Sequence, residues 1–150
     1  TGLEKIKSES IDIPFEDNAF DVVCAFQMLE HLPFDQSLLA FRELVRVAKN
    51  AVVISLPDAA TRWPISIHVP KVGLVQFSLP RPRLVALKHK FDGEHYWEIN
   101  KAGYSFKHVK KELLDCGMVS LLKTFRVHEN PYHRFFVFEK ENNNKGCSKL

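Results

Sequence analysis

The chain has 150 residues, of which 45% are hydrophobic and 26% charged, the proportions of a soluble globular domain with a real core. Its net charge of +3 is too small to indicate nucleic-acid binding, which usually requires a clustered basic face. The three cysteines are odd in number and lack Cys-x-x-Cys spacing, and no run of about 18 apolar residues occurs. These features argue against a disulfide framework and a membrane-spanning helix, and they favour a reducing, cytoplasmic compartment.

The first clear elements are a strand, a helix and a second strand. Residues 20–26 form a nearly continuous apolar run, typical of a parallel strand that is buried on both faces. A helix is expected to begin at residues 33–35 and to end at residues 49–50, with one apolar face at helical spacing. Residues 51–56 form a second apolar strand before Pro57. Their short connections predict a right-handed βαβ unit with a parallel strand pair.

The middle of the chain does not continue this alternation of strand and helix. Residues 58–101 are rich in proline and mix apolar with basic pieces, so we expect an insertion that packs over the domain, with a helix over residues 83–89. Residues 79–90 carry a basic and apolar pattern that could contact an anionic membrane surface or a phosphorylated acceptor. We favour an amphipathic helix that covers the core.

The last part predicts a helix and two strands. Ser105 is a good N-cap for a helix, and Gly117 is a natural residue to follow its end in the left-handed conformation. Strands are expected at residues 119–127 and 134–139, and the short turn between them makes an antiparallel pair the simplest arrangement. We assign residues 1–140 to one partial domain and expect a disordered polar tail over residues 141–150.

Three ordered motifs resemble a known family. Residues 12–23 are DIPFEDNAFDVV, residues 27–32 are QMLEHL and residues 41–47 are FRELVRV. They are similar, in this order, to the "LPF-x-D-x-x-FD-x-V" signature, the "LEH" turn and the "E-x-x-R-V" helix of the class I S-adenosylmethionine-dependent methyltransferases, type 11. The resemblance is close over residues 5–57 and looser beyond.

The resemblance implies an α/β fold: a Rossmann-like three-layer sandwich that ends in an antiparallel strand pair. It also implies S-adenosylmethionine as the cofactor. Ligands of open α/β sheets bind beyond the carboxyl ends of the strands. Counting back from the family's Pro places the adenine-binding residues at Glu9, Ser10 and Ile11, although Asp is more usual than Glu at the first position. Phe26 and Gln27 would line the cofactor.

The largest departure from the family is the absence of its glycine-rich loop, since the chain contains no Gly-x-Gly pattern. The acidic residue that binds the ribose hydroxyls is missing too. We expect both to lie upstream of Thr1, in a longer protein of which this chain is the C-terminal portion. In the family's sheet the first strand pairs with the fourth, so here residues 20–26 would present an open apolar edge.

His31 is the candidate catalytic residue, because a histidine beside the acceptor can remove a proton near neutral pH. The alternative, a histidine that packs the turn, is favoured, because methyl transfer often needs only alignment of acceptor and donor. Residues 95–98 (HYWE) could form part of an acceptor pocket, although we favour a role in anchoring the insertion. The histidine spacing predicts no metal site.

The sequence therefore predicts methyl transfer from S-adenosylmethionine to a small-molecule or lipid-like acceptor. The alternative is a non-catalytic, methyltransferase-like module that binds a partner through its insertion or its open edge. Neither the acceptor atom nor the oligomeric state follows from the sequence.

Overall fold

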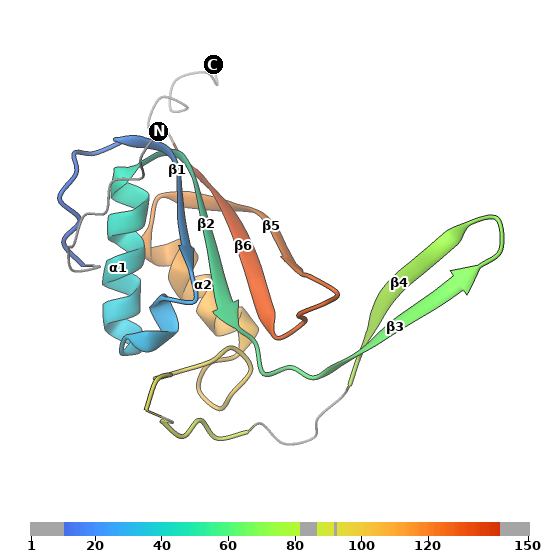
Figure 1. The fold of residues 1–150 in the computed structure, drawn as a ribbon. Coiled ribbons are helices and arrows are strands. Elements are labelled where there is room, and N and C mark those ends of the chain that lie inside the picture. The colour runs from blue at the N-terminus through green and yellow to red at the C-terminus, as the bar shows by residue number, and fades with distance from the viewer. Residues whose placement is uncertain (1–10, 82–86, 92, 142–150) are drawn as a thin grey trace, which may run out of the picture.

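A computed structural model describes residues 11–81, 87–91 and 93–141. Its elements are β1 (Phe20–Phe26), the short 3₁₀ helix η1 (Leu29–His31), α1 (Phe34–Val47), β2 (Ala48–Pro57), β3 (Arg62–Val69), β4 (Gly73–Pro80), α2 (Phe106–Cys116), β5 (Val119–Arg126) and β6 (His133–Lys140). Four of the strands form one sheet in the order β1-β2-β6-β5, and β3 pairs only with β4 in a separate hairpin (Figure 1).

The predicted βαβ unit and the terminal strand pair are confirmed. β1 pairs with β2 in parallel, whereas β2 pairs with β6 and β6 with β5 in antiparallel fashion. Strand β2 begins directly at the end of α1, three residues earlier than the apolar pattern indicated. The fold class is thus confirmed as a partial Rossmann-like α/β fold, in which the described residues supply the sheet and one of its helical layers.

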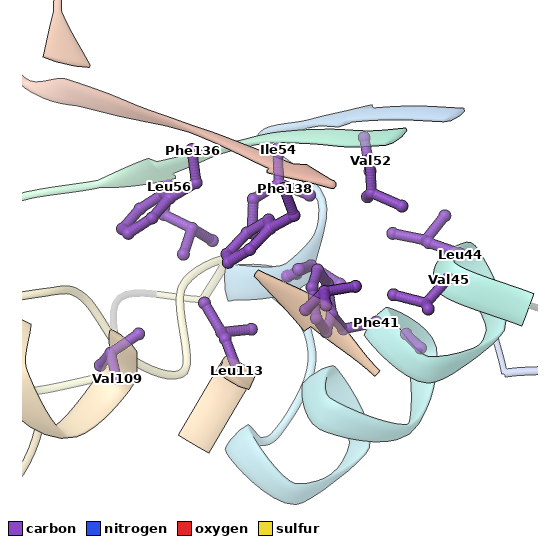
Figure 2. Close-up of a cluster of buried hydrophobic side chains, with 14 of the residues drawn as sticks. Phe41, Leu44, Val45, Val52, Ile54, Leu56, Val109, Leu113, Phe136 and Phe138 are labelled. Atoms are coloured by element: carbon purple, nitrogen blue, oxygen red, sulfur yellow. The ribbon is translucent and has the colours of Figure 1, made fainter. Parts of the chain in front are cut away.

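The core lies between the sheet and both helices. Buried side chains from α1 and α2 pack against those of β2 and β6, as Figure 2 shows for Phe41, Leu113, Ile54, Phe136 and Phe138. The same set includes Val52 and Leu56 on β2, which alternate with residues of the opposite face as a strand period of two requires. Because both helices use the same face, the amphipathic pattern of each is explained by one shared core.

Strand β1 is not buried on both faces, which corrects the sequence prediction. It lies at the edge of the described sheet, and Val22 and Phe26 are each exposed over about half of their surface, at 52% and 53%. Only Ala25 is buried, because its side chain points to the helical layer. The described residues therefore leave the apolar side chains of Val22 and Phe26 uncovered. The position of β1 at the edge of the sheet agrees with the open edge expected from the sequence.

The segment after β2 also differs from the prediction in part. Strands β3 and β4 form a hairpin that projects from the body of the molecule and does not pack over it (Figure 1). Residues 97–99, in contrast, are buried against the core. Of the helix predicted over residues 83–89, residues 83–86 lie outside the described part, and Leu87 forms an isolated bridge with Lys101.

The left-handed cap predicted at Gly117 does not form at the end of α2. Its φ of −129° is not left-handed, so no positive-φ cap forms there. A Cβ at this position would lie 3.4 Å from the Val45 side chain and 3.5 Å from that of Phe41. These are ordinary van der Waals distances, so neither backbone conformation nor close packing requires glycine here.

The predicted N-cap of α2 is confirmed, since the Ser105 hydroxyl accepts a hydrogen bond from the His108 amide at 3.2 Å. We expect Ser105→Ala to lower the free energy of unfolding by about 1 kcal/mol, because one amide of the first turn loses its partner. Urea unfolding followed by circular dichroism measures this change. Ser105→Asp retains an acceptor and should remain close to wild type; equal losses in both variants would contradict a capping role.

Candidate active site at the carboxyl ends of β1 and β2

A clamp from α1 fixes the loop that leads into β1. The Arg46 guanidinium donates to the carbonyls of Ile13 and Phe15 at 2.9 and 2.8 Å and pairs with Asp17 and Glu43. Hydrogen bonding to Arg46 lowers the pKa of the Glu43 carboxyl, which also accepts from the Ile13 amide. Glu43 and Arg46 are the charged residues of the "E-x-x-R-V" motif, so the motif has a structural function: it positions the loop before β1.

The carboxyl ends of β1 and β2 meet at one edge because these strands are parallel. Gln27 follows β1 with a left-handed φ of 51°. Its backbone N–H donates to the carbonyl and the hydroxyl of Ser55 on β2. A non-glycine residue in this conformation is uncommon and often marks a functional turn. Phe26 and Gln27 are therefore exposed at the edge where ligands of such sheets bind.

The turn after β1 brings together Glu30, His31 and His95. Each offers one potential ligand or proton-transfer atom, and these atoms lie within 4.8 Å of one another. His31 is exposed, its Nδ1 lies 2.9 Å from the Glu94 carbonyl, and its ring centroid is 5.0 Å from that of His95. Among the described residues this is the group that could hold a metal ion, whereas the sequence predicted none; no finding tests that prediction.

Glu30 is the buried member of this cluster. Its side chain is 1% exposed, and neither carboxylate oxygen has a hydrogen-bond partner among the described residues. Burial raises the pKa of the Glu30 carboxyl, and the nearby histidines reduce that rise. A buried acid beside an exposed histidine is an arrangement suited to sharing or moving a proton.

The Ser37 hydroxyl fastens the cluster to the core. It donates to the Leu29 carbonyl at 2.6 Å and accepts from the Trp97 indole at 3.0 Å. Trp97 is buried and packs on Phe34, which agrees with the favoured anchoring role. Tyr96 instead is 44% exposed, and its ring contacts that of Phe91 at 4.7 Å.

A pocket of about 420 Å³ opens beside this cluster, beyond the end of β2. Glu98 lines it and also faces the cluster, because one of its carboxylate oxygens lies 4.0 Å from Nδ1 of His95. Lys101, a second lining residue, forms an ion pair with Glu98. The pocket wall also contains Asp58, Leu87 and Tyr132, so it is partly polar and partly apolar.

A network around Asp58 forms the wall of the pocket at the end of β2. The Asp58 side chain is fully buried and pairs with Arg126 on β5 and with Arg134 on β6. Asn100 and the Ala60 amide donate to its other oxygen at 2.7 and 2.9 Å. Burial alone would raise the pKa of Asp58, but the hydrogen bonds outweigh it and the pKa is lowered.

Sequence reasoning placed some of these residues and missed others. Phe26, Gln27 and His31 lie at or just past the end of β1, and their roles stay predictions. Ile11 is 42% exposed ahead of the clamped loop. Glu9 and Ser10 lie outside the described residues. The positions of Asp58 and Lys101 in the pocket wall were missed. A signal was available for Asp58, because it is a charged residue directly after a buried strand.

The order of the sheet and the ligand edge define a Rossmann-like fold of the class I methyltransferase type, and the comparisons agree. Residues 3–56 match the sequence model of the methyltransferase-domain family, type 11. Over this part, which holds β1, α1 and most of β2, the chain is similar to the class I S-adenosylmethionine-dependent methyltransferases. No curated protein matched the chain.

Solved structures share the fold at low sequence identity. The PH0226 protein of Pyrococcus horikoshii gives a TM-score of 0.54 at 14% identity, over 91% of this chain and 58% of that one. Magnesium protoporphyrin IX methyltransferase of Synechocystis, solved with bound S-adenosylhomocysteine (SAH), gives 0.51 at 12% over 91% and 50%. The [4+2]-cyclase SpnF gives 0.51 at 12% over 89% and 54%. The chain thus spans between one half and three fifths of the length of these structures.

Helices long and apolar enough to cross a membrane are absent from the described residues. Cys24 and Cys116 are both free thiols.

Asp58 gives a prediction about acid stability. We expect Asp58→Asn to lower the free energy of unfolding at neutral pH by about 3 kcal/mol, because two buried guanidinium groups lose their counter-charge. A lowered pKa means that Asp58 stabilises the fold above the ordinary aspartate value of 3.8 and loses this effect as the pH falls through its own lower pKa. The difference in free energy of unfolding between Asp58→Asn and wild type should therefore become smaller in strong acid.

Urea unfolding across this pH range measures both quantities. Asp21→Asn is the matched control, because Asp21 is exposed and lies 3.9 Å from Lys49. It should change the free energy of unfolding by no more than about 0.5 kcal/mol. A constant difference between Asp58→Asn and wild type at all pH values would contradict a titrating, network-forming role.

Proposed function

We propose that this chain takes part in cytoplasmic methyl transfer from S-adenosylmethionine to a small-molecule or lipid-like acceptor, as part of a longer protein. The observation that supports this most directly is the family match over residues 3–56, because it covers the strand and turn that build the ligand edge. The bound SAH named for the Synechocystis enzyme supports the choice of cofactor. The partial span of these structures supports a longer protein.

The residues at this edge fit one side of the cofactor. Phe26 and Ile11 offer exposed apolar surface, and Gln27 presents a polar side chain from a fixed turn. We assign Glu9, Ser10 and Ile11 to the adenine, and Phe26 and Gln27 to the adjoining wall. When bound, S-adenosylmethionine supplies an electrophilic methyl group.

His31 acts on the acceptor side in this proposal. The interaction of its Nδ1 with the Glu94 carbonyl orients the ring, and a neutral Nε2 then accepts a proton from an acceptor hydroxyl or ammonium group. The Glu30 carboxylate stabilises the positive charge that His31 gains, because the two side chains lie in the same cluster. The neighbouring pocket, with Glu98 and Lys101 in its wall, receives the acceptor.

A non-catalytic binding module is the second candidate function. The observation that favours it is the open edge of β1 with its exposed apolar residues, which is suited to pairing with another strand. The SpnF cyclase also shows a similar fold in a protein with a different named activity, and fold alone does not determine chemistry.

Calorimetry with SAH distinguishes these candidates. We expect the intact longer protein to bind SAH, and the 150-residue chain alone to bind it weakly or not at all, because the glycine-rich loop is not among its residues. Absence of binding to the intact protein would refute the enzymatic proposal. Micromolar binding to the 150-residue chain would refute the assigned importance of the missing loop.

Transfer of label from methyl-labelled S-adenosylmethionine to a lipid and small-molecule extract tests His31. We expect His31→Gln in the intact protein to lower kcat roughly 10²-fold, because proton removal by a positioned base contributes at least that much. His108→Gln is the matched control, since His108 is exposed on α2 and pairs with Glu112. If His31→Gln left kcat unchanged, His31 would only pack the turn.

A further inference from the structure

The face of the β3–β4 hairpin on which Trp63 lies is entirely apolar. Strands alternate their side chains between two faces, and the register places Trp63 opposite Leu79, Ile65 opposite Phe77 and Ile67 opposite Val75. The other face mixes polar and apolar residues: Ser66 lies opposite Gln76, Pro64 opposite Ser78 and His68 opposite Leu74. We call the first set, Trp63, Ile65, Ile67, Val75, Phe77 and Leu79, the hairpin apolar face.

This face is open to solvent. Trp63 is 53% exposed and Ile67 48%, and Figure 1 shows the hairpin projecting away from the sheet and helices. An isolated two-stranded hairpin is only marginally stable in water, and monomeric proteins rarely expose a continuous apolar surface without a partner. The hairpin apolar face is therefore suited to binding an apolar surface.

The charged residues of the segment that contains the hairpin are all basic. Residues 59–91 contain no Asp or Glu and six basic residues, namely Arg62, Lys71, Arg81, Arg83, Lys88 and Lys90. Lys71 lies at the tip of the hairpin, between β3 and β4. The Arg81 guanidinium lies 5.8 Å from the centre of the Trp63 ring, beside the hairpin apolar face.

An apolar surface flanked by cations such as Lys71 and Arg81 is complementary to an anionic lipid bilayer, where acyl chains meet negative headgroups. Tryptophan and basic side chains favour this interface because they combine an apolar body with a polar end. Two copies of the hairpin would instead bring basic residues together, which opposes self-association.

We propose that the hairpin apolar face, with Lys71 and Arg81 beside it, docks the protein on an anionic phospholipid membrane. The sequence pattern offered such contact as an alternative for residues 79–90, whereas the surface proposed here lies within residues 62–81. The root of the hairpin joins the pocket, because Thr61 and Arg62 line the pocket wall. Docking thus brings the pocket close to the lipid headgroups, although the proposal does not depend on methyl transfer.

Vesicle binding by the full chain tests the proposal. We expect sedimentation with vesicles of phosphatidylcholine and phosphatidylserine, and much weaker binding to phosphatidylcholine alone or at high salt. Ile67→Gln should weaken binding roughly tenfold, because it removes an aliphatic side chain from the face. Lys71→Gln should weaken it about fivefold through the loss of one charge near the headgroups.

Leu74→Gln is the matched control, because Leu74 is a 61% exposed aliphatic residue of the same hairpin, opposite His68 on the other face. It should bind as wild type does. Fluorescence of the unmodified chain adds a test that needs no variant: of its two tryptophans, Trp97 is buried, so a blue shift on adding vesicles reports Trp63.

Three results would overturn the proposal. The first is no binding and no blue shift with the anionic vesicles. The second is an equal loss for Leu74→Gln and Ile67→Gln. The third is a dimer in sedimentation equilibrium that Ile67→Gln dissociates, because the face would then bind a second copy. None of these readouts involves SAH, so failure here leaves the proposed methyl transfer untouched.

Discussion

The buried carboxylate of Asp58 is the interaction on which the arrangement of this protein depends. It stands one residue past β2, and it receives Arg126 from β5, Arg134 from β6 and Asn100 from the segment before α2. Four parts of the chain that are distant in sequence therefore meet at one charge. A carboxylate buried this deeply is tolerated only because hydrogen bonds satisfy both of its oxygens. Its position fixes the wall of the pocket and the root from which the hairpin leaves.

That common root connects the two surfaces to which we assign functions. The pocket and the cluster around His31 lie at the carboxyl edge of the sheet, and the β3–β4 hairpin begins in the wall of the same pocket. Ser37 and Trp97 join the turn after β1 to the segment that returns from the hairpin. The site is thus built from the turn after β1, the segment after β2 and the segment that returns from the hairpin. They meet at the edge where open α/β sheets bind their ligands.

The fold alone does not determine the chemistry of this protein, because similar folds occur in proteins with different named activities. Structures with a similar fold include a methyltransferase and a cyclase by their names, so the arrangement of strands does not select a reaction. The particular side chains at the edge, a buried Glu30 beside an exposed His31 and the charged pair of Glu98 and Lys101, are what suit this site to handling a proton and a polar acceptor.

The sequence by itself determined the βαβ unit, the N-cap at Ser105 and the strand pair at the end of the chain, because these follow from local periodicity and from turns between neighbours. It also placed Phe26, Gln27 and His31 at the ligand edge through their motifs. Only the tertiary structure decided that Gly117 follows α2 without a left-handed cap and that the hairpin projects with one apolar face. It likewise brought Asp58 to its arginines and Glu30 to His95. Each of these depends on contacts between residues far apart in sequence, and no local pattern encodes which distant side chain will fill a given space or neutralise a given charge.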